Sequence, residues 1–190
     1  MMPASQTDRH VDEIGLLYIA LARLFDKPLE AVRLAPDITS LAEALGVAGF
    51  AEFFKETSNV DIEGHRVEMF ELAPRCPPYG GYYALGEYGN ERGWYMHQIL
   101  TYYKAFGFEL DVKKELPDYL PAVLEFLGAT RAVENREKEI IRRDFYRRFL
   151  KPWLERFAEC VEKTGSPYRH LVAALRHLLQ LDFETAAQSL

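Results

Sequence analysis

The sequence predicts an all-α fold, a helical bundle in a single domain that spans residues 1–190. Three observations support this. Apolar residues recur at three- and four-residue spacing along most of the chain, no stretch shows the sustained alternation of a strand, and no linker divides the chain. A chain of 190 residues is also long enough to bury one core. We therefore expect at least six helices and no sheet.

The N-terminal half contains the shorter predicted helices. Residues 11–25 are amphipathic, and Pro28 should end that helix and open the next one. Residues 73–93 are rich in proline and glycine, which predicts a long loop without helix. Loops of this length are often functional. The loop contains four tyrosines, Tyr79, Tyr82, Tyr83 and Tyr88. They either bind a partner or fasten the loop to the core.

The C-terminal half contains the longer predicted helices. Residues 94–106 form one of them, and Gly107 ends it because glycine adopts the left-handed conformation without steric cost. Residues 133–163 form a second helical region, which Pro152 should break near its own position. Trp153 in this region is expected to be buried. A further helix is predicted over residues 168–181.

The segment 115–127 is the most informative part of the chain. Pro117 and Pro121 both suit the first turn of a helix, so the helix is expected to begin near Pro117. Its buried face should consist of Leu116, Leu120, Val123, Leu124 and Leu127. Asp118 and Glu125 lie seven residues apart, away from that face. They are either a helix cap and a solvated surface, or an acidic pair that holds a basic peptide.

Charge and hydropathy limit the function classes. The net charge of −6 argues against nucleic-acid binding and is compatible with a basic protein or peptide partner. Residues 1–10 are polar, so we expect no signal peptide, and no run of 18 apolar residues predicts a membrane segment. A strip of basic residues consists of Arg142, Arg143, Arg147, Arg148 and Lys151. A solvated helix face explains this basic strip better than a nucleic-acid site does.

The sequence contains no recognised catalytic or metal motif. Neither a nucleotide-binding glycine loop nor an HExxH motif is present. His170 and His177 lack a third ligand for a metal. The two cysteines, Cys76 and Cys160, predict neither a disulfide framework nor a metal set, which fits a reducing compartment. We expect no enzyme, metal or cofactor. A small helical enzyme that uses His97, Cys76 or the acidic pair is the alternative.

Four motifs, taken in order, resemble the TorD/DmsD/NarJ family of redox-enzyme maturation chaperones. They are Cys76-Pro-Pro-Tyr79, Tyr103-Lys-Ala-Phe-Gly-Phe108, Glu115-Leu-Pro-Asp-Tyr-Leu-Pro121 and Leu150-Lys-Pro-Trp-Leu-Glu-Arg-Phe157. The third motif is similar to the form found in the NarJ-like branch. Tyr119 and Phe149 depart from the pattern, because many members have histidine there. A tyrosine can still donate a hydrogen bond and stack on another ring.

The resemblance implies a helical, cytoplasmic chaperone that is not an enzyme. Such proteins bind the catalytic subunit of a molybdopterin oxidoreductase, their client, often through its N-terminal leader. They hold it until the molybdenum cofactor is inserted, before assembly or twin-arginine export. They are monomers or helix-swapped dimers, with a plausible hinge near Glu115. The alternative is an accessory or scaffold subunit that stays in a redox complex. The expected client-binding residues are Pro78, Tyr79, Tyr82, Phe106, Leu116, Asp118, Tyr119 and Glu125.

Overall fold

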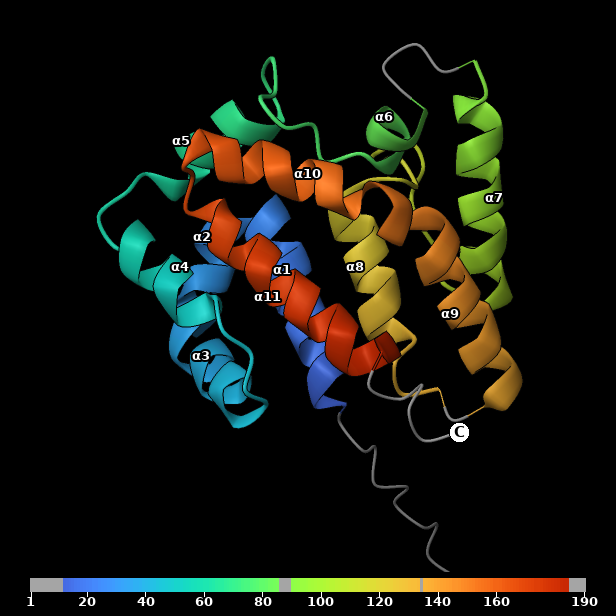
Figure 1. Cartoon of the computed structure of the whole chain (residues 1–190), viewed down its shortest axis with the longest axis horizontal. Helices are drawn as coiled ribbons and strands as arrows, with labels where there is room; N and C mark the ends of the chain where they lie inside the picture. The colour runs from blue at the N-terminus through green and yellow to red at the C-terminus, as the bar shows by residue number, and fades with distance from the viewer. Residues whose placement is uncertain (1–11, 86–89, 134, 185–190) are drawn as a thin grey trace, which may run out of the picture.

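The computed structural model describes residues 12–85, 90–133 and 135–184. These residues form α-helices and short helical turns, with one isolated β-bridge and no strand among them, so the all-α prediction is confirmed (Figure 1). The predictions made for residues 1–10, and for Gly86, Tyr88 and Gly89, lie outside this part of the chain.

The N-terminal helices surround one end of the molecule. They are α1 (Glu13–Asp26), α2 (Pro28–Ala31), α3 (Ala35–Ala44), α4 (Phe50–Thr57) and α5 (Ile62–Phe70). Helix α1 begins at Asp12, whose side chain accepts a hydrogen bond from the Gly15 N–H at 2.7 Å. It ends before Pro28, which opens α2 as expected because a proline at this position lacks only an N–H that would be unpaired.

The remaining helices complete the bundle. They are α6 (Gly80–Leu85), α7 (Arg92–Ala105), α8 (Leu120–Ala129), α9 (Arg136–Phe149), α10 (Lys151–Thr164), α11 (Tyr168–Leu179) and a π-helical turn, Gln180–Glu184. Pro152 separates α9 from α10 as predicted, and Gly107 follows α7 with φ of 67°. Trp153 is fully buried, which confirms its assignment to the core.

Helices α1 and α8 form the centre of the fold. A β-carbon on Gly15 would lie 2.9 Å from the carbonyl oxygen of Gly128, so both positions need glycine for the two backbones to approach this closely. Seven of the ten residues of α8 are buried, and its Phe126 ring packs on Phe145 of α9 with the ring centroids 4.7 Å apart. The site described below lies where the segment before α8 meets α6.

Three sequence predictions about this region are wrong. Residues 80–85 are helical, although the density of glycine and proline predicted a loop. Helix α8 begins at Leu120 rather than near Pro117, because Tyr119 is held in an extended conformation (φ −67°, ψ 127°) by the isolated bridge to Tyr79. Leu116 therefore lies outside the helix, where helical spacing does not apply, and 38% of it is exposed.

A fourth error concerns the cysteines. Cys76 and Cys160 are joined by a disulfide with a Cα–Cα distance of 5.8 Å, within the range that a disulfide requires. The two residues are 84 positions apart, so only the packing of the preceding loop against α10 brings them together. Sequence spacing contains no signal for such a pair.

The basic strip is also only partly a solvated face. Arg142 is buried, and its guanidinium donates to both carboxylate oxygens of Asp182 at 2.9 and 2.7 Å. Asp182 also accepts from the Tyr18 hydroxyl at 3.0 Å. This buried cluster fastens the C-terminal turn to α9 and α1.

Candidate functional site

The loop motif and the segment before α8 pair directly. The Gly80 N–H donates to the Asp118 carbonyl at 2.9 Å, and the Leu120 N–H donates to the Pro78 carbonyl at 2.8 Å. Between these two bonds, the rings of Tyr79 and Tyr119 pack with their centroids 5.2 Å apart. Two segments forty residues apart in the sequence are thus fixed side by side.

We call this contact between residues 78–80 and 118–120 the junction. The other two motifs pack against it. A β-carbon on Gly80 would lie 2.7 Å from Nε1 of Trp153, so the loop rests directly on the indole ring. That indole donates its N–H to the Phe149 carbonyl at 2.5 Å. The Tyr103 hydroxyl donates to the Pro117 carbonyl at 2.8 Å. All four motifs therefore meet in one place, which their order in the sequence does not show.

Asp118 lies inside this junction and not on a solvated face. Its residue is 1% exposed, and its Oδ2 accepts from the Gly81 N–H at 2.9 Å and from Arg92 at 3.3 Å. The sequence interpretation placed it in the first turn of its own helix, but it caps the first turn of α6 instead. Burial raises the pKa of this carboxyl more than Gly81 and Arg92 lower it.

A recess of about 300 Å³ opens beside the tyrosine pair. Its lining residues come from the end of α1, the segment before α8 and α8 itself: Asp26, Lys27, Leu110, Lys114, Glu115, Tyr119, Pro121, Ala122 and Glu125. The Tyr119 hydroxyl donates to Oδ1 of Asp26 at 3.1 Å. The recess therefore combines three carboxylates and two lysines, Lys27 and Lys114, with apolar surface from a proline, an alanine and a leucine, so that carboxylates outnumber cations. We call it the acidic recess.

Two carboxyls of the acidic recess, those of Glu115 and Glu125, are destabilised in their charged forms. Burial raises the pKa of Glu115, and the neighbouring charge of Asp26 raises it further. The pKa of Glu125 is raised by the same two causes, against the opposing charges of Arg23 and Lys27. A cation placed between Glu115 and Glu125 would stabilise both charged forms.

A second, shallower recess of about 250 Å³ shares Lys114 and Glu115 with the acidic recess. Its other lining residues are Tyr79, Val112, Lys113 and Leu116. Val112 is 52% exposed and Leu116 is 38% exposed, so two apolar side chains are accessible here, beside the charged Lys113, Lys114 and Glu115. Together the two recesses place these two apolar side chains next to the three carboxylates.

The structure brings together six of the eight predicted client-binding residues. Pro78, Tyr79, Asp118 and Tyr119 form the junction, while Leu116 and Glu125 line the two recesses. Tyr82 and Phe106 do not line either recess. Tyr82 contacts Tyr83, and the Phe106 ring packs on Phe126 beneath the Lys138 ammonium.

Sequence reasoning missed Asp26 as a member of the site. Asp26 lies at the predicted end of the first helix, two residues before Pro28, and 93 residues from Tyr119 in the sequence. A carboxylate in the last turn of a helix is disfavoured by the helix dipole, and this was a signal that the sequence did offer.

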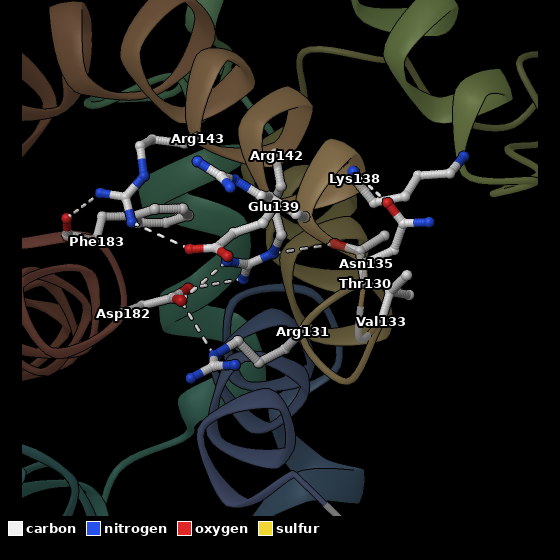
Figure 2. A pocket seen from close by; sticks show the side chains of 11 residues that line it. Thr130, Arg131, Val133, Asn135, Lys138, Glu139, Arg142, Arg143, Asp182 and Phe183 are labelled. Atoms are coloured by element: carbon white, nitrogen blue, oxygen red, sulfur yellow. Dashed lines mark hydrogen bonds and ion pairs between the residues drawn. The ribbon is translucent and has the colours of Figure 1, made fainter. Parts of the chain in front are cut away.

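Another recess, of about 600 Å³, lies between the start of α9 and the C-terminal turn (Figure 2). Several cations line it, and three of them, Arg131, Arg142 and Arg143, have partners within the protein. Arg142 and Arg131 both pair with Asp182, and Arg143 donates to the Phe183 carbonyl at 2.5 Å. These contacts assign the three arginines a structural role.

The part of the chain that the structure describes shows neither a metal-binding cluster nor a membrane-spanning helix. No group of three or more acidic, histidine or cysteine side chains there is arranged to hold a metal ion. His170 contacts Glu56 at 2.9 Å. Of the helices in residues 12–85, 90–133 and 135–184, none is long and apolar enough to cross a bilayer.

Comparison with known proteins identifies the family. Residues 33–159 match the model of the nitrate reductase delta subunit family. The chain is 30% identical over 182 residues to a Bacillus subtilis (strain 168) protein named "Probable nitrate reductase molybdenum cofactor assembly chaperone NarJ", covering 92% of this chain and 91% of that protein.

A solved structure shares the fold. The crystal structure of a redox enzyme maturation protein from Archaeoglobus fulgidus has a TM-score of 0.57 and 22% sequence identity, over 95% of this chain and 97% of the other. The family match covers the loop motif, the segment before α8 and most of α10, so it includes the residues of the junction. The chain therefore belongs to the nitrate reductase delta subunit family.

Proposed function

We propose that this protein is a maturation chaperone for the catalytic subunit of a molybdopterin oxidoreductase. It binds a basic and partly apolar segment of that subunit and holds the subunit until the molybdenum cofactor is inserted. The names of the family and of the Bacillus relative support the chaperone role. The observation that supports the binding mode is the acidic recess, which lies next to the Tyr79–Tyr119 pair.

The client segment would use both recesses. An arginine or lysine side chain enters the acidic recess and pairs with Glu115, Glu125 and Asp26, since charge-assisted pairs with carboxylates are among the stronger hydrogen bonds. Neighbouring apolar side chains lie on Val112 and Leu116. A partly helical client segment would supply such a pattern at i and i+4 spacing. An N-terminal leader with flanking arginines, including a twin-arginine leader, has this composition.

Asp118 contributes to binding by positioning. Its carboxylate is enclosed, so it fixes the start of α6 and the conformation of Tyr79 and Tyr119 rather than pairing with the client at the surface. Pro78 also positions the two tyrosines, because its carbonyl accepts a hydrogen bond from the Leu120 N–H. Direct contact is left to Tyr79, Tyr119, Glu125 and Leu116.

The chaperone would work in the cytoplasm, where cofactor insertion precedes assembly or export, and would not be an enzyme. A small helical enzyme would need a histidine beside its carboxylate. The polar partners of Asp118 are the Gly81 N–H and Arg92, while Glu125 lies in an open recess. A scaffold subunit would instead co-purify in fixed ratio with the mature oxidoreductase, and we expect the protein to be absent from it.

The oligomeric state is proposed to be a monomer that can exchange helices as a dimer. The connection between α7 and α8, residues 106–119, would be the hinge, since it contains Gly107 and several exposed residues. Light scattering coupled to size-exclusion chromatography tests this. A dimer that persists when residues 108–114 are lengthened would argue against exchange at this hinge.

Calorimetric titration tests the proposed binding site. The ligand is a synthetic peptide with the N-terminal sequence of the nitrate reductase catalytic subunit from the same organism. Glu125→Gln should weaken binding by about 1–3 kcal/mol, because it removes a charge-assisted hydrogen bond. Glu43→Gln, an exposed carboxylate on α3, serves as the matched control and should bind like wild type.

The peptide offers a second control. Replacing its arginines by glutamine should weaken binding to the wild type and abolish the difference between wild type and Glu125→Gln. Equal affinities of wild type, Glu125→Gln and Glu43→Gln for the unmodified peptide at low salt would place the client site elsewhere on the protein.

A further inference from the structure

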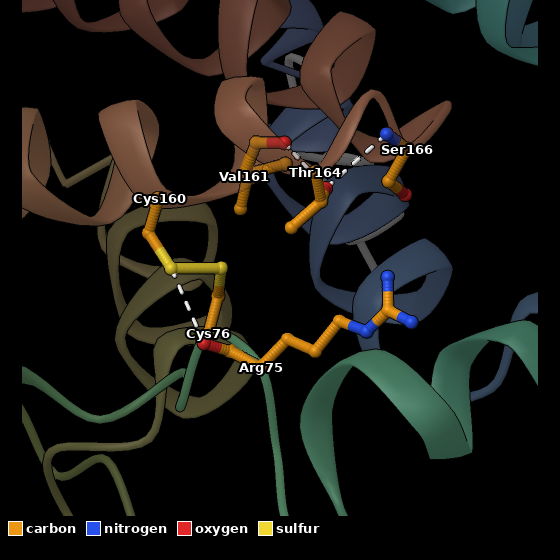
Figure 3. The surroundings of a disulfide bond; sticks show 6 residues. All are labelled: Arg75, Cys76, Cys160, Val161, Thr164 and Ser166. Atoms are coloured by element: carbon orange, nitrogen blue, oxygen red, sulfur yellow. Dashed lines mark hydrogen bonds between the residues drawn. A yellow bond between two sulfur atoms is a disulfide. The ribbon is translucent and has the colours of Figure 1, made fainter.

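We propose that Cys76 and Cys160 form a reversible thiol–disulfide site that sets the position of the loop presenting Tyr79 to the client. This inference depends on the proposed function for its consequence but not for its chemistry. Cys76 lies between α5 and α6, and Cys160 lies on α10, with Cα atoms 5.8 Å apart (Figure 3). The bond therefore joins the loop to the body of the bundle.

The loop transmits the position of Cys76 to the site over a very short distance. Only Pro77 and Pro78 separate Cys76 from Tyr79, and proline fixes the backbone φ angle at both positions. The Pro78 carbonyl accepts from the Leu120 N–H at 2.8 Å, and Tyr79 packs on Tyr119. A shift of Cys76 relative to α10 must therefore move Tyr79 or disturb its contact with Tyr119.

The other side of Cys76 is loosely held. Residues 71–73 are exposed, and Leu72 is 74% exposed. Ala73 has a φ of 46°, a left-handed conformation that is unfavourable for a residue with a β-carbon. The Cys76 N–H donates to the Met69 carbonyl at 3.2 Å. Besides this hydrogen bond, two ion pairs hold the segment to α5, Arg66–Glu71 at 2.8 Å and Arg75–Glu68 at 2.7 Å. Opening the disulfide therefore removes the only covalent anchor of a segment that has backbone strain to release.

The two sulfurs differ in accessibility, which defines the order of the exchange reaction. Cys76 is fully buried, whereas Cys160 is half-buried. A thiolate of a reducing dithiol therefore attacks Sγ of Cys160, the S–S bond breaks, and Cys76 leaves as a thiolate that takes a proton from water. The second thiol of the reductant then releases Cys160, so two electrons pass to the protein and the reductant becomes a disulfide.

The reduced form is also accommodated by the structure. Sγ of Cys160 lies 3.3 Å from the Arg75 carbonyl oxygen, which can accept the S–H of the thiol once the disulfide is open (Figure 3). A protein disulfide or oxidised glutathione reverses the reaction by the same two exchanges. In a reducing compartment, such bonds are usually transient and respond to the redox state. Oxidation would favour client binding, and reduction would favour release.

Two measurements on the full-length chain test the proposal. The protein is prepared in oxidised form with oxidised glutathione and in reduced form with reduced glutathione, and alkylation followed by mass spectrometry counts the free thiols. Hydrogen exchange over residues 71–79 should be faster in the reduced form. The oxidised form should bind the leader peptide more tightly by about fivefold or more, the lower range of an allosteric coupling.

The matched variant is Cys76→Ala with Cys160→Ala, which should resemble the reduced form in both measurements and give no response to glutathione. Hydrogen exchange needs no client. It therefore tests whether the disulfide holds residues 71–79 in place even if the peptide binds neither form and the proposed function fails. The proposal is overturned if reduced glutathione does not open the bond in the folded protein, if exchange over residues 71–79 is the same in both forms, or if both forms bind the peptide equally.

Discussion

The backbone N–H of Gly81 donates a hydrogen bond to Oδ2 of Asp118 across 2.9 Å and so ties the first turn of α6 to the turn before α8. The space between them admits no side chain, since a β-carbon on Gly81 would lie 2.8 Å from the same oxygen. Arg92, at the start of α7, reaches this oxygen from the other side at 3.3 Å. One carboxylate, two residues before α8, therefore contacts the first turns of both α6 and α7.

Gly81→Ala should destabilise the protein by about 1–3 kcal/mol, because the added methyl group forces Asp118 out of its position. The control is Gly93→Ala on the exposed first turn of α7, where nothing lies within 4 Å of the new β-carbon. That change should be neutral or stabilise by about 0.5–1 kcal/mol, since alanine favours helix over glycine. Urea denaturation of both variants measures the difference. Similar midpoints would show that α6 can move away from Asp118.

Trp153→Ala should cost about 3–5 kcal/mol, as expected for truncation of a fully buried aromatic side chain. It removes the surface on which Gly80 and the stacked Tyr83 ring rest, and it leaves the Phe149 carbonyl with only the long hydrogen bond from the Tyr95 hydroxyl at 3.4 Å. Trp94→Ala, at a position that is 62% exposed, should change stability by no more than about 0.5 kcal/mol. Thermal unfolding followed by circular dichroism compares them, and an equal loss in both would contradict the assignment.

Asp118→Asn should alter how stability depends on pH. Burial raises the pKa of Asp118 above its ordinary value of 3.8. The folded state then holds the proton more tightly than the unfolded state, so its contribution to stability is present below pH 3.8 and is lost as pH rises to the folded pKa. Asparagine does not titrate, so the Asp118→Asn variant does not lose this contribution to stability as the pH rises.

The free energy of unfolding of wild type, relative to Asp118→Asn, should therefore fall as pH rises through this window and stay constant above it. Urea denaturation at intervals between about pH 3 and pH 7 measures the difference. A difference that stays the same at every pH, or that increases with pH, would mean that the pairing with Arg92 outweighs burial.

Asp182→Ala should destabilise the protein by about 3–5 kcal/mol, because it leaves the buried guanidinium of Arg142 without its carboxylate. Asp111→Ala removes the exposed partner of Lys114 and should leave the urea midpoint unchanged, since ion pairs in water contribute little. If Asp182→Ala unfolds at the same urea concentration as wild type, water or Glu139 must replace the lost carboxylate.

The local prediction of helices succeeded where the signal is local. Pro152 separates α9 from α10, and Gly107 follows α7 in the left-handed conformation, because backbone sterics act within one or two residues. The apolar repeat from Leu120 to Leu127 was also identified as a buried face. The motifs that resemble the chaperone family marked the segments of the candidate site, although not the way in which they meet.

The same local rules failed at α6 and at Asp118. A six-residue helix that begins with two glycines has no intrinsic stability, so its propensity predicted a loop; Asp118 and Trp153, which are distant in sequence, hold it in place. Asp118 looked like a surface charge because charged residues are usually exposed. Its burial depends on Gly81 and Arg92, and neither is within twenty residues of it.

The sequence by itself thus determined the helical fold, most helix ends and the family, because these depend on periodicity, on proline and glycine, and on motifs that can be compared in order. Only the tertiary structure decided that four motifs share one junction, that Asp26 joins Glu115 and Glu125 in the acidic recess, and that Cys76 meets Cys160. The physical reason is that burial, charge pairing and disulfide formation depend on distances in space. Packing around α1 and α8 sets those distances between residues as many as 164 positions apart, as for Tyr18 and Asp182.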